Sequence, residues 1–567
     1  MSRIIGIDLG TSTSEAAILV NGKPVMIPNL EGEFVIPSVV GIDDNQDIIV
    51  GSKAVEQMLL RPKDTVIEVK RKMGTDELIY LGDSSYSPIW VSAQILSYIR
   101  NYASEYLKEK VDRAVITVPA YFNEQQRKAT VEAGRQAGLK VERIINEPTA
   151  AALCYGLEHL DEEKHILIYD LGGGTFDVTI LEMFDGVLEV KASSGDNRLG
   201  GTDFDECIIT YLVNEFMNKE GIDLRKDVYA MIKLKVEAEK CKIALSSQDS
   251  YDIILPLIAS EKGTPVSLQE TITVDVFEEL IHELLKRTKE PIDVVLEDSG
   301  IAKEDIDFII LAGGSTRIPF VKRYIEEILQ MKPEELIDPE LAIALGAAIQ
   351  AGMLNDEISL TDGIILTDVN PYALGVRASM HMDGFLYDDF MDIIIPRNVT
   401  IPVTRSKIFT TAVNGQTTAI VEVYQGEKVE ATKNNLLGEF VLSGIPASKA
   451  GIEKIDVSFS YDVNGMLQVE GTIVSTGEKS NIVIDMLGDI VEEKIDVSSW
   501  KEAKKSIKYR SIIRKAEKLL KDDIDDEDRE ELEDSIYELK KELIQESGEV
   551  DLNEIEEDIL EILEDYI

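Results

Sequence analysis

Hydrophobic positions change their spacing along the chain, and these changes divide it into regions. Up to about residue 355, β-rich runs alternate with helical ones, an order typical of an α/β architecture. RAVITVPAYF (113–122) and IDFIILAGG (306–314) are two such runs, and a predicted helix follows each. The helices predicted in this region cover Glu124–Ala137, about 224–245, a segment from Phe320, and Ala342–Leu354.

The alternation of β-rich and helical runs ends after Asp356. Gly363–Asp368 (GIILTD) resembles a linker but carries three large aliphatic residues. Because flexible linkers are usually polar, we expect this stretch to dock on a neighbouring surface. From about 370 to 488 the signals are those of strands only, and the turn Asn464-Gly465 predicts a hairpin. We interpret this region as an antiparallel β-sandwich.

The last stretch, about 496–567, is helical in pattern and very acidic. Its apolar residues keep a helical stripe at Leu532, Ile536, Leu539 and Leu543. We therefore predict packed amphipathic helix here rather than a disordered acidic tail.

Composition narrows the class of protein. The 567 residues include 58 basic and 106 acidic ones, a net charge of −48, so we expect neither nucleic acid nor a membrane as partner. The three cysteines form no CxxC pair, and the four histidines show no ligand spacing. The N-terminus enters a strand without a charged leader, and no apolar run is long enough to span a membrane. We expect a soluble, cytoplasmic protein.

One short pattern occurs twice. DLGTSTSEAAIL begins at Asp8 and DLGGGTFDVTIL begins at Asp170, 162 positions later, with Asp, Leu, Gly, Thr, Ile and Leu identical. In each copy an Asp at the end of a strand precedes a turn of small and hydroxyl residues. Such turns let backbone N–H groups approach an anion, and the Asp can orient a hydrated hard cation. Two facing copies predict a phosphate clamp around Mg²⁺.

Four other segments carry candidate chemistry, although no GxxxxGK[ST] loop is present. They are the basic cluster Val69–Lys72, the helix start INEPTAAAL with Glu147, the glycine pair in RLGGTDFDE (198–206), and LAGGSTRIP (311–319) between a strand and a helix. A lysine of Val69–Lys72 could reach a γ-phosphate. The backbone of LAGGSTRIP could approach a ribose or a phosphate.

With these motifs in this order, residues 1–355 resemble the DnaK-type heat-shock chaperones. The resemblance rests on IDLGTSTS, VKRKMG, VPAYFNEQQRKAT, INEPTAAAL, DLGGGTFDVTIL, GDNRLGGTDFD, EAEKCKIALSS and LAGGSTRIP. In the β-region it rests on NPYALG, RNVTIPV, VYQGE and NLLGEFVLSGIP. LTDVNPYALGV, NNLLGEF and the short C-terminus are most similar to the divergent bacterial HscC branch.

The resemblance implies an ATPase with Mg²⁺ at Asp8 and Asp170, and a K⁺ ion nearby. The implied catalytic residues are Lys70, Glu147, Asp170, Thr175 and Asp177. The residues implied for the β- and γ-phosphates are Gly10, Thr11, Ser12, Thr13, Gly172, Gly173 and Gly174. Those implied for the rest of ATP or ADP are Gly200, Gly201, Glu239, Lys242, Ser246, Gly313, Gly314, Ser315 and Arg317.

The resemblance also implies partners. An extended apolar segment of an unfolded protein would lie in a groove lined by Val376, Phe409, Ala412, Ala419, Val421 and Met466. Pro119 and Arg143 match positions that relay nucleotide state, and Arg143 and Asp368 match positions used with J-domain co-chaperones. A nucleotide-exchange factor is a further implied partner.

The implied fold is multidomain. It has a duplicated actin-like (ribonuclease H-like) α/β nucleotide-binding domain at 1–356, an apolar linker at 357–369, a β-sandwich peptide-binding domain at 370–490, and a shortened helical lid at 491–567.

The chain departs from the family pattern at several positions. The first turn is Gly-Thr-Ser-Thr, where the family usually has Gly-Thr-Thr-Asn, and Thr367 stands where the linker usually has an aliphatic residue. Ser379 stands where the family places a methionine that arches over the bound peptide, and Ala419 stands where it has a bulkier groove residue. The stretch 377–397 is longer than usual, and the lid is about half the usual length.

Two other classes of protein share the phosphate turns. A small-molecule kinase would need an acceptor hydroxyl site and would have no evident use for residues 370–567. A filament-forming actin relative would need self-complementary surfaces, which the net charge of −48 disfavours. The sequence favours an ATP-driven chaperone over both.

Overall fold

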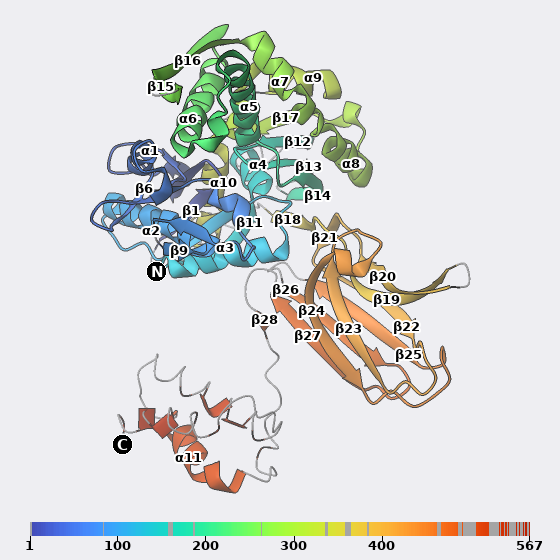
Figure 1. Cartoon of the computed structure of the whole chain (residues 1–567). Helices are drawn as coiled ribbons and strands as arrows, with labels where there is room; N and C mark the ends of the chain where they lie inside the picture. Colours follow the sequence, from blue (N-terminus) through green and yellow to red (C-terminus); the bar gives the residue numbers. More distant parts are fainter. Residues whose placement is uncertain are drawn as a thin grey trace. The chain divides into compact units, whose positions relative to one another are not determined.

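The computed structural model describes residues 3–82, 84–156, 163–184, 187–261, 264–334, 338–355, 357, 365–382, 385–461, 466–485, 490–491, 500 and 506–520, with scattered residues from 532 to 566. The chain divides into two compact units, 1–490 and 491–567 (Figure 1). Within the described ranges, none of the helices combines the length and the hydrophobicity that crossing a membrane requires.

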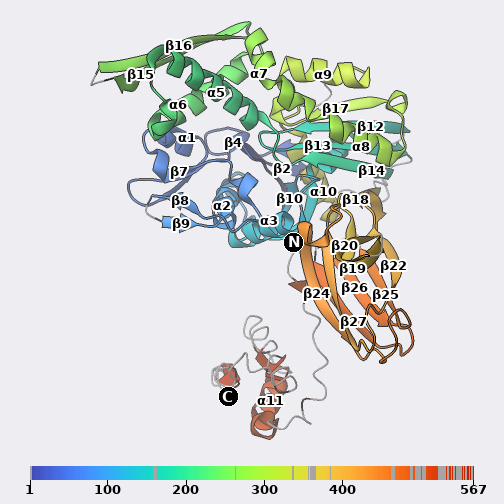
Figure 2. The same ribbon diagram turned by 45° about the vertical axis from the view of Figure 1, so that its right-hand side comes forward.

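Two six-stranded sheets form the centre of the α/β half of the chain (Figure 2), and the four-strand orders β10-β1-β2-β3 and β17-β12-β13-β14 correspond. The first contains β1 (Ile4–Leu9), β2 (Thr13–Val20), β3 (Lys23–Met26), β4 (Val35–Pro37), β10 (Arg113–Val118) and β11 (Lys140–Asn146). The second contains β12 (Lys164–Leu171), β13 (Phe176–Phe184), β14 (Val187–Asp196), β17 (Phe308–Ala312), β18 (Ile365–Asn370) and β21 (Val399–Ile401).

The two sheets repeat one topology. Each opens with an antiparallel meander, β1-β2-β3 or β12-β13-β14, and its first strand also pairs in parallel with a later strand, β10 or β17. The sharp turns that carry the repeated sequence pattern therefore occupy equivalent places, after β1 and after β12.

Helices α4 (Glu147–Gly156) and α10 (Ala342–Leu354) are small-residue helices that pack closely against each other and against the first sheet. A Cβ at Gly346 would lie 1.7 Å from the carbonyl oxygen of Ala150, and one at Gly6 would lie 2.2 Å from the nitrogen of Ala348. Only glycine permits this approach, which brings α10 to the base of the cleft between the sheets.

The remaining elements of this half surround the sheets. Before β11 they are β5 (Val40–Ile42), β6 (Ile48–Val50), α1 (Ser52–Met58), β7 (Thr65–Val66), β8 (Ile79–Leu81), β9 (Ser84–Tyr86), α2 (Pro88–Leu107) and α3 (Glu124–Gln136). After β14 they are α5 (Gly201–Glu220), α6 (Val228–Ala244), the hairpin β15 (Ser250–Glu261) and β16 (Thr264–Thr273), α7 (Val274–Lys286), α8 (Lys289–Ser299) and α9 (Pro319–Leu329).

The helix predicted over 224–245 starts later than the sequence pattern indicates. Leu224–Lys226 forms a 3-10 turn, and α6 begins at Val228. The side chain of Asp227 accepts hydrogen bonds from the N–H groups of Tyr229 and Ala230, which makes Asp227 the N-cap. The apolar spacing continues through the cap, so periodicity alone does not reveal the break.

The described part of the aliphatic linker is a strand. In β18, Ile365, Leu366 and Thr367 pair in parallel with Val187–Glu189 of β14. The second half of the same strand, Asp368–Asn370, pairs antiparallel with β21. The stretch therefore docks on the second sheet through backbone hydrogen bonds.

The β-rich region forms two antiparallel sheets around one core. One sheet contains β19 (Leu374–Met382), β20 (Phe385–Ile395), β23 (Thr418–Gln425) and β24 (Asn435–Ser443). The other contains β22 (Val403–Thr410), β25 (Lys454–Tyr461), β26 (Met466–Ile473), β27 (Lys479–Asp485) and β28 (Ile490–Val491). Val423, Leu442, Phe459 and Val469 belong to the shared core. The predicted turn Asn464-Gly465 lies outside the described residues, although β25 and β26 on either side of it pair as a hairpin requires.

The second unit holds α11 (Ser506–Leu519) and its own apolar cluster. The four residues of the predicted stripe, Leu532, Ile536, Leu539 and Leu543, are all buried in that cluster with Ile513 of α11. The acidic C-terminal stretch therefore contains a packed core.

Thr367 gives a test of linker docking. Its hydroxyl is buried, and among the described residues it has no hydrogen-bond partner. Replacing it with Val, which has nearly the same shape, should stabilise the docked strand by roughly 1 kcal/mol, because an unsatisfied buried hydroxyl costs free energy. Hydrogen exchange of the β18 amides should become about fivefold slower in Thr367→Val. Thr367→Ser, which keeps the hydroxyl, serves as the control, and faster exchange in Thr367→Val would contradict this account.

Candidate functional site

The two repeated turns face each other across the cleft. A Cβ on Gly173 would lie 2.1 Å from Oγ of Ser12, and one on Gly174 would lie 2.7 Å from Oγ1 of Thr11. The registers are also equivalent, since Asp8 pairs with Glu15 in β1–β2 and Asp170 pairs with Asp177 in β12–β13. Residues that are 162 positions apart thus form one cradle, as the repeated sequence predicts.

The cradle encloses a small polar cavity of about 60 Å³. Its lining residues that were predicted from the sequence are Asp8, Gly10, Thr11, Ser12, Thr13, Lys70, Glu147, Asp170, Gly172, Gly173, Thr175, Gly313 and Gly314. Glu15, Pro339, Glu340 and Ile343 also line it and were not predicted. Backbone turns, hydroxyls and one lysine around so small a space fit a chain of phosphate groups.

A buried ion pair closes one side of this cavity. Lys70, in the 3-10 turn Val69–Lys72, donates from Nζ to Oε1 of Glu147 at 2.5 Å. Burial raises the pKa of Glu147 to about 7, against the opposing effect of Lys70. Burial alone lowers the pKa of Lys70, because it disfavours the charged form. The negative charges of Glu147 and Asp8 outweigh this effect, so the pKa of Lys70 is raised. The lysine therefore keeps its charge beside the phosphate turns.

Two buried aspartates point into the cavity from the ends of β1 and β12. Asp8 accepts a hydrogen bond from Oγ1 of Thr117 at 2.7 Å, and Oδ2 of Asp170 has no partner among the described residues. Burial raises the pKa of both carboxyls, and for Asp170 the charges of Glu147 and Asp177 add to the rise. Carboxylate oxygens without protein partners are suitable for holding the water shell of Mg²⁺. The residues present therefore fit the predicted magnesium site.

Asp177 occupies a different place from the one the sequence suggests. It does not line the small cavity; its Oδ1 accepts the backbone N–H of Tyr121 at 3.0 Å. Burial raises its pKa to about 6, although that hydrogen bond lowers it. Asp177 is thus placed to hold the loop after β10 rather than to face the phosphate space directly.

A second cavity of about 550 Å³ opens beside the first and continues it outward. It is lined by Ser12, Thr13, Gly173, Glu239, Lys242, Ser246, Gly314, Ser315 and Arg317, all predicted from the sequence, and by Ile243, Ile318, Lys322 and Glu340. Lys242 is held by Asp205 at 2.7 Å, and Arg317 by Asp338 at 2.6 Å. The volume and the mixed lining suit a nucleoside.

Gly200 and Gly201 shape the cradle from outside the cavities. The N–H of Gly201 donates to the carbonyl of Gly172, and a Cβ on Gly200 would lie 2.5 Å from backbone atoms of Gly173 and Gly174. Arg71 closes the same side by donating to the carbonyl of Gly174 and pairing with Asp203. These contacts fix the second turn in place.

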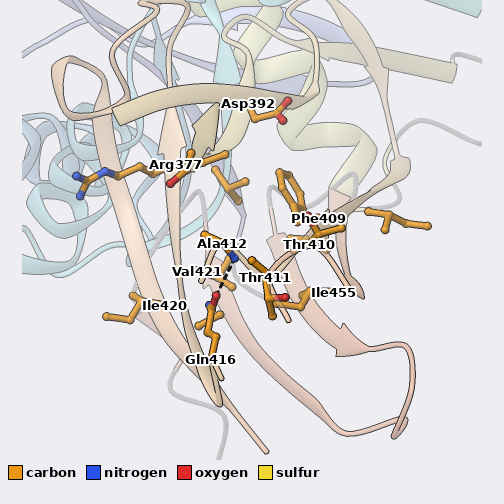
Figure 3. A pocket seen from close by; sticks show the side chains of 18 residues that line it. Arg377, Asp392, Phe409, Thr410, Thr411, Ala412, Gln416, Ile420, Val421 and Ile455 are labelled. Atoms are coloured by element: carbon orange, nitrogen blue, oxygen red, sulfur yellow. Dashed lines mark hydrogen bonds between the residues drawn. The ribbon is translucent and has the colours of Figure 1, made fainter. Parts of the chain in front are cut away.

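The β-region contains a separate groove of about 590 Å³ (Figure 3). Five of the predicted groove residues line it, namely Val376, Phe409, Ala412, Ala419 and Val421. The side chain of the sixth, Met466, lies outside the described residues. Figure 3 shows Phe409 and Val421 on facing walls, with Gln416 accepting the N–H of Ala412 at 2.8 Å.

The β-region contacts the α/β half through the loop after β10. Oη of Tyr372 donates to the carbonyl of Tyr121 at 2.6 Å, and the two rings lie 4.4 Å apart. Gln425 accepts the backbone N–H of Glu124 at 3.2 Å. Asp368 accepts from the side chain of Asn146 at 2.7 Å. The loop that holds Asp177 is therefore in direct contact with the β-region.

Arg127 connects the loop that contains Pro119 with Asn146, which contacts Asp368. Arg127 donates to the carbonyl of Ala120, next to Pro119, and to Oδ1 of Asn146, which in turn contacts Asp368. Arg143 is half-buried on β11, and within the described part of the chain it makes no hydrogen bond. Arg127 lies in the motif VPAYFNEQQRKAT, where its helical position gives no signal that it reaches back to the loop.

The comparison with protein families gives one result for nearly the whole chain. A family model described as Hsp70 protein matches residues 4–79 and 76–565. The match therefore includes both phosphate turns, the linker strand, the groove and most of the second unit.

Gly200 provides a test of the cradle. In Gly200→Ala the new methyl group would overlap the backbone of the second turn, so we expect a loss of about 1–3 kcal/mol in unfolding free energy. Gly172→Ala is the matched control, because its Cβ would meet its nearest atom only at 3.8 Å. Denaturant unfolding of the two variants measures the difference. Equal destabilisation would show that Gly200 does not lie against the second turn.

Asp368 should make stability depend on pH. It lies partly buried beside Asn146, and desolvation raises its pKa to about 6 from the ordinary 3.8. The unfolded chain loses this proton near pH 4 and the folded chain only near pH 6, so stability should fall as the pH rises through this window, by roughly 3 kcal/mol at most. Unfolding free energies of the wild type and Asp368→Asn, measured from pH 4 to 7, isolate this contribution. Parallel pH profiles for the two proteins would contradict it.

Proposed function

The chain belongs to the Hsp70 family, whose members are ATP-dependent chaperones, and we propose that it hydrolyses ATP in the cradle to control peptide binding in the β-region groove. The observation that carries this proposal is the pair of contacts by which Tyr121 joins Asp177, beside the cradle, to Tyr372 of the β-region. The N–H of Tyr121 donates to Asp177 beside the cradle, and its carbonyl accepts from Tyr372 of the β-region.

In the proposed nucleotide site the chain positions groups and neutralises charge, which is what phosphoryl transfer requires. Bound Mg²⁺ would supply charge neutralisation at the phosphates, held through water by Asp8 and Asp170. Lys70 lines the small cavity and would contact the terminal phosphate, and its hydrogen bond to Glu147 fixes its direction. Thr175 and the ionised Glu147 would orient the attacking water, while Glu239, Lys242 and Arg317 would surround the adenosine.

The proposed peptide site is the groove between Val376, Phe409, Ala412, Ala419 and Val421. An extended chain could bind there through main-chain hydrogen bonds and place one apolar side chain in the pocket between the walls. Ala419 leaves more space than a larger residue would. We infer that the groove accepts bulky aliphatic or aromatic side chains.

The proposed domain assignment keeps the boundaries that the sequence suggests. These are nucleotide binding at 1–356, a linker at 357–369, peptide binding at 370–490 and a short lid at 491–567. Within the Hsp70 family, we assign the chain to the HscC branch on its LTDVNPYALGV and NNLLGEF segments. Arg143 and Asp368 remain the proposed contacts for a J-domain co-chaperone, and a nucleotide-exchange factor is a further expected partner.

The proposal is tested by single-turnover ATP hydrolysis with the full-length chain, with and without an extended apolar peptide. Coupling between the sites predicts that the peptide accelerates hydrolysis and that ATP weakens peptide binding, because linkage is reciprocal. Hydrolysis that does not respond to peptide would show that the nucleotide and peptide sites are not coupled. If calorimetry detects no binding of adenine nucleotide, the proposed function is wrong.

Tyr372 is expected to carry part of the coupling. Tyr372→Phe deletes only the hydroxyl that donates to the carbonyl of Tyr121, a bond worth about 1 kcal/mol. We therefore expect the peptide stimulation of hydrolysis to fall about fivefold while basal hydrolysis stays unchanged. Tyr80→Phe, at a tyrosine that is 71% exposed, is the matched control. Full stimulation in Tyr372→Phe would show that the signal does not pass through this contact.

A further inference from the structure

The turn that carries Lys70 begins at a residue with an uncommon backbone conformation. Glu68 has a φ of 57°, in the left-handed region, and its carbonyl accepts the N–H of Arg71 at 3.1 Å to start the 3-10 turn Val69–Lys72. Glycine adopts this conformation without strain, whereas a residue with a side chain seldom does. Such strain persists where the surrounding structure holds it, and it often accompanies a function. The conformation thus points to a use for the Glu68 side chain.

The carboxylate of Glu68 forms an ion pair across the cleft. Nζ of Lys235, on α6, lies 2.5 Å from Oε1 of Glu68, and the two side chains are 33% and 20% exposed. Val69, next to Glu68, is buried in the core of the first sheet, whereas α6 contributes Leu234 and Ala238 to the core of the second. The ion pair therefore joins the two sides of the cleft.

Helix α6 also lines the proposed nucleoside cavity. Its side chains there include Glu239 and Lys242. Lys235 precedes these residues by four and seven positions, so the three side chains lie along one face of the helix. A nucleoside that fixes this face of α6 consequently also fixes Lys235, one turn further along.

The same turn has a second anchor on the far side of the cleft. Arg71 is held by Asp203 of α5, and Glu68 is held by Lys235 of α6. Lys70 stands between Glu68 and Arg71 in the chain, so both of its flanking residues are tied to the second side. The direction of Lys70 therefore depends on whether the cleft is closed.

We propose that Lys235 is a positioning residue for hydrolysis, which pairs with Glu68 and so orients Lys70 toward the terminal phosphate when α6 closes on the nucleoside. The inference rests on the proposed nucleotide site, and it gives the nucleoside end of ATP control over the reaction at the other end. Lys235 is not among the described residues that line either cavity, so it acts through Glu68.

Single-turnover hydrolysis, with the full-length chain in excess over Mg·ATP, tests this role. Lys235→Met keeps the length of the side chain and removes its charge. It should slow hydrolysis about tenfold, while the Kd for ADP in calorimetry changes less than about twofold. Lys235→Arg keeps the charge and should retain most of the rate. Lys240→Met is the matched control, because Lys240 is exposed on α6 and pairs with Glu237 of the same helix.

A double-mutant cycle shows whether the effect passes through Glu68. Glu68→Gln should slow hydrolysis by a similar factor, and the double variant Glu68→Gln/Lys235→Met should be no slower than either single one, because two partners of one interaction are not additive. Hydrogen exchange gives a readout that does not depend on turnover. ADP should slow exchange of the Arg71 and Met73 amides in the wild type, and this protection should be at least about threefold smaller in Lys235→Met.

The outcomes separate this inference from the proposed function. Hydrolysis at the wild-type rate in Lys235→Met, an equal loss in Lys240→Met, or multiplying losses in the double variant would overturn the positioning role and leave the nucleotide site standing. A wild-type chain that binds no adenine nucleotide overturns the proposed function instead. If ADP does not protect the Arg71 and Met73 amides of the wild type, the inference is wrong whether or not the variants fold.

Discussion

Close backbone approach between two glycine turns is the constraint on which the rest of the molecule depends. Gly173 and Gly174 lie against Ser12 and Thr11 so tightly that no side chain would fit between them. Since each turn ends a strand of a different sheet, this contact fixes the distance between the sheets and the size of the cavity. Helix α10 meets the first sheet through similarly close contacts, so the base of the cleft is fixed by the same means.

The cradle concentrates negative charge around one lysine. Asp8, Glu15, Glu147 and Asp170 all border a cavity of about 60 Å³. Folding therefore places carboxylates where they are unfavourable in the absence of cations, a common property of sites built to bind charged ligands. The stability of this half of the chain and its affinity for ions should consequently be linked, since any ion that binds only the folded chain stabilises it.

Much of the site could be predicted from the sequence, because its main residues lie in short motifs that repeat or resemble a family. The motifs identified most of the residues lining the two cavities and five of those lining the groove. They did not identify Glu15, which has the appearance of an ordinary polar residue in a strand, or Tyr372, whose importance arises from a contact 251 positions away in sequence. Arg127 was missed for a related reason: helix geometry does not reveal that a long side chain turns back to the preceding loop. Local patterns predict elements and motifs, while long-range pairings require coordinates.

The double pairing of β18 has a mechanical consequence. Its first half is bonded to β14 and its second half to β21, so the two ladders are arranged in series along one strand. Tension between the α/β half and the β-region would load both ladders, and the first to rupture would relieve the other. Each ladder has three pairs, and the one with β14 includes Thr367, whose buried hydroxyl has no hydrogen-bond partner among the described residues. Rupture of the ladder with β14 would free the first half of β18 from the second sheet while the pairing of its second half with β21 stayed intact.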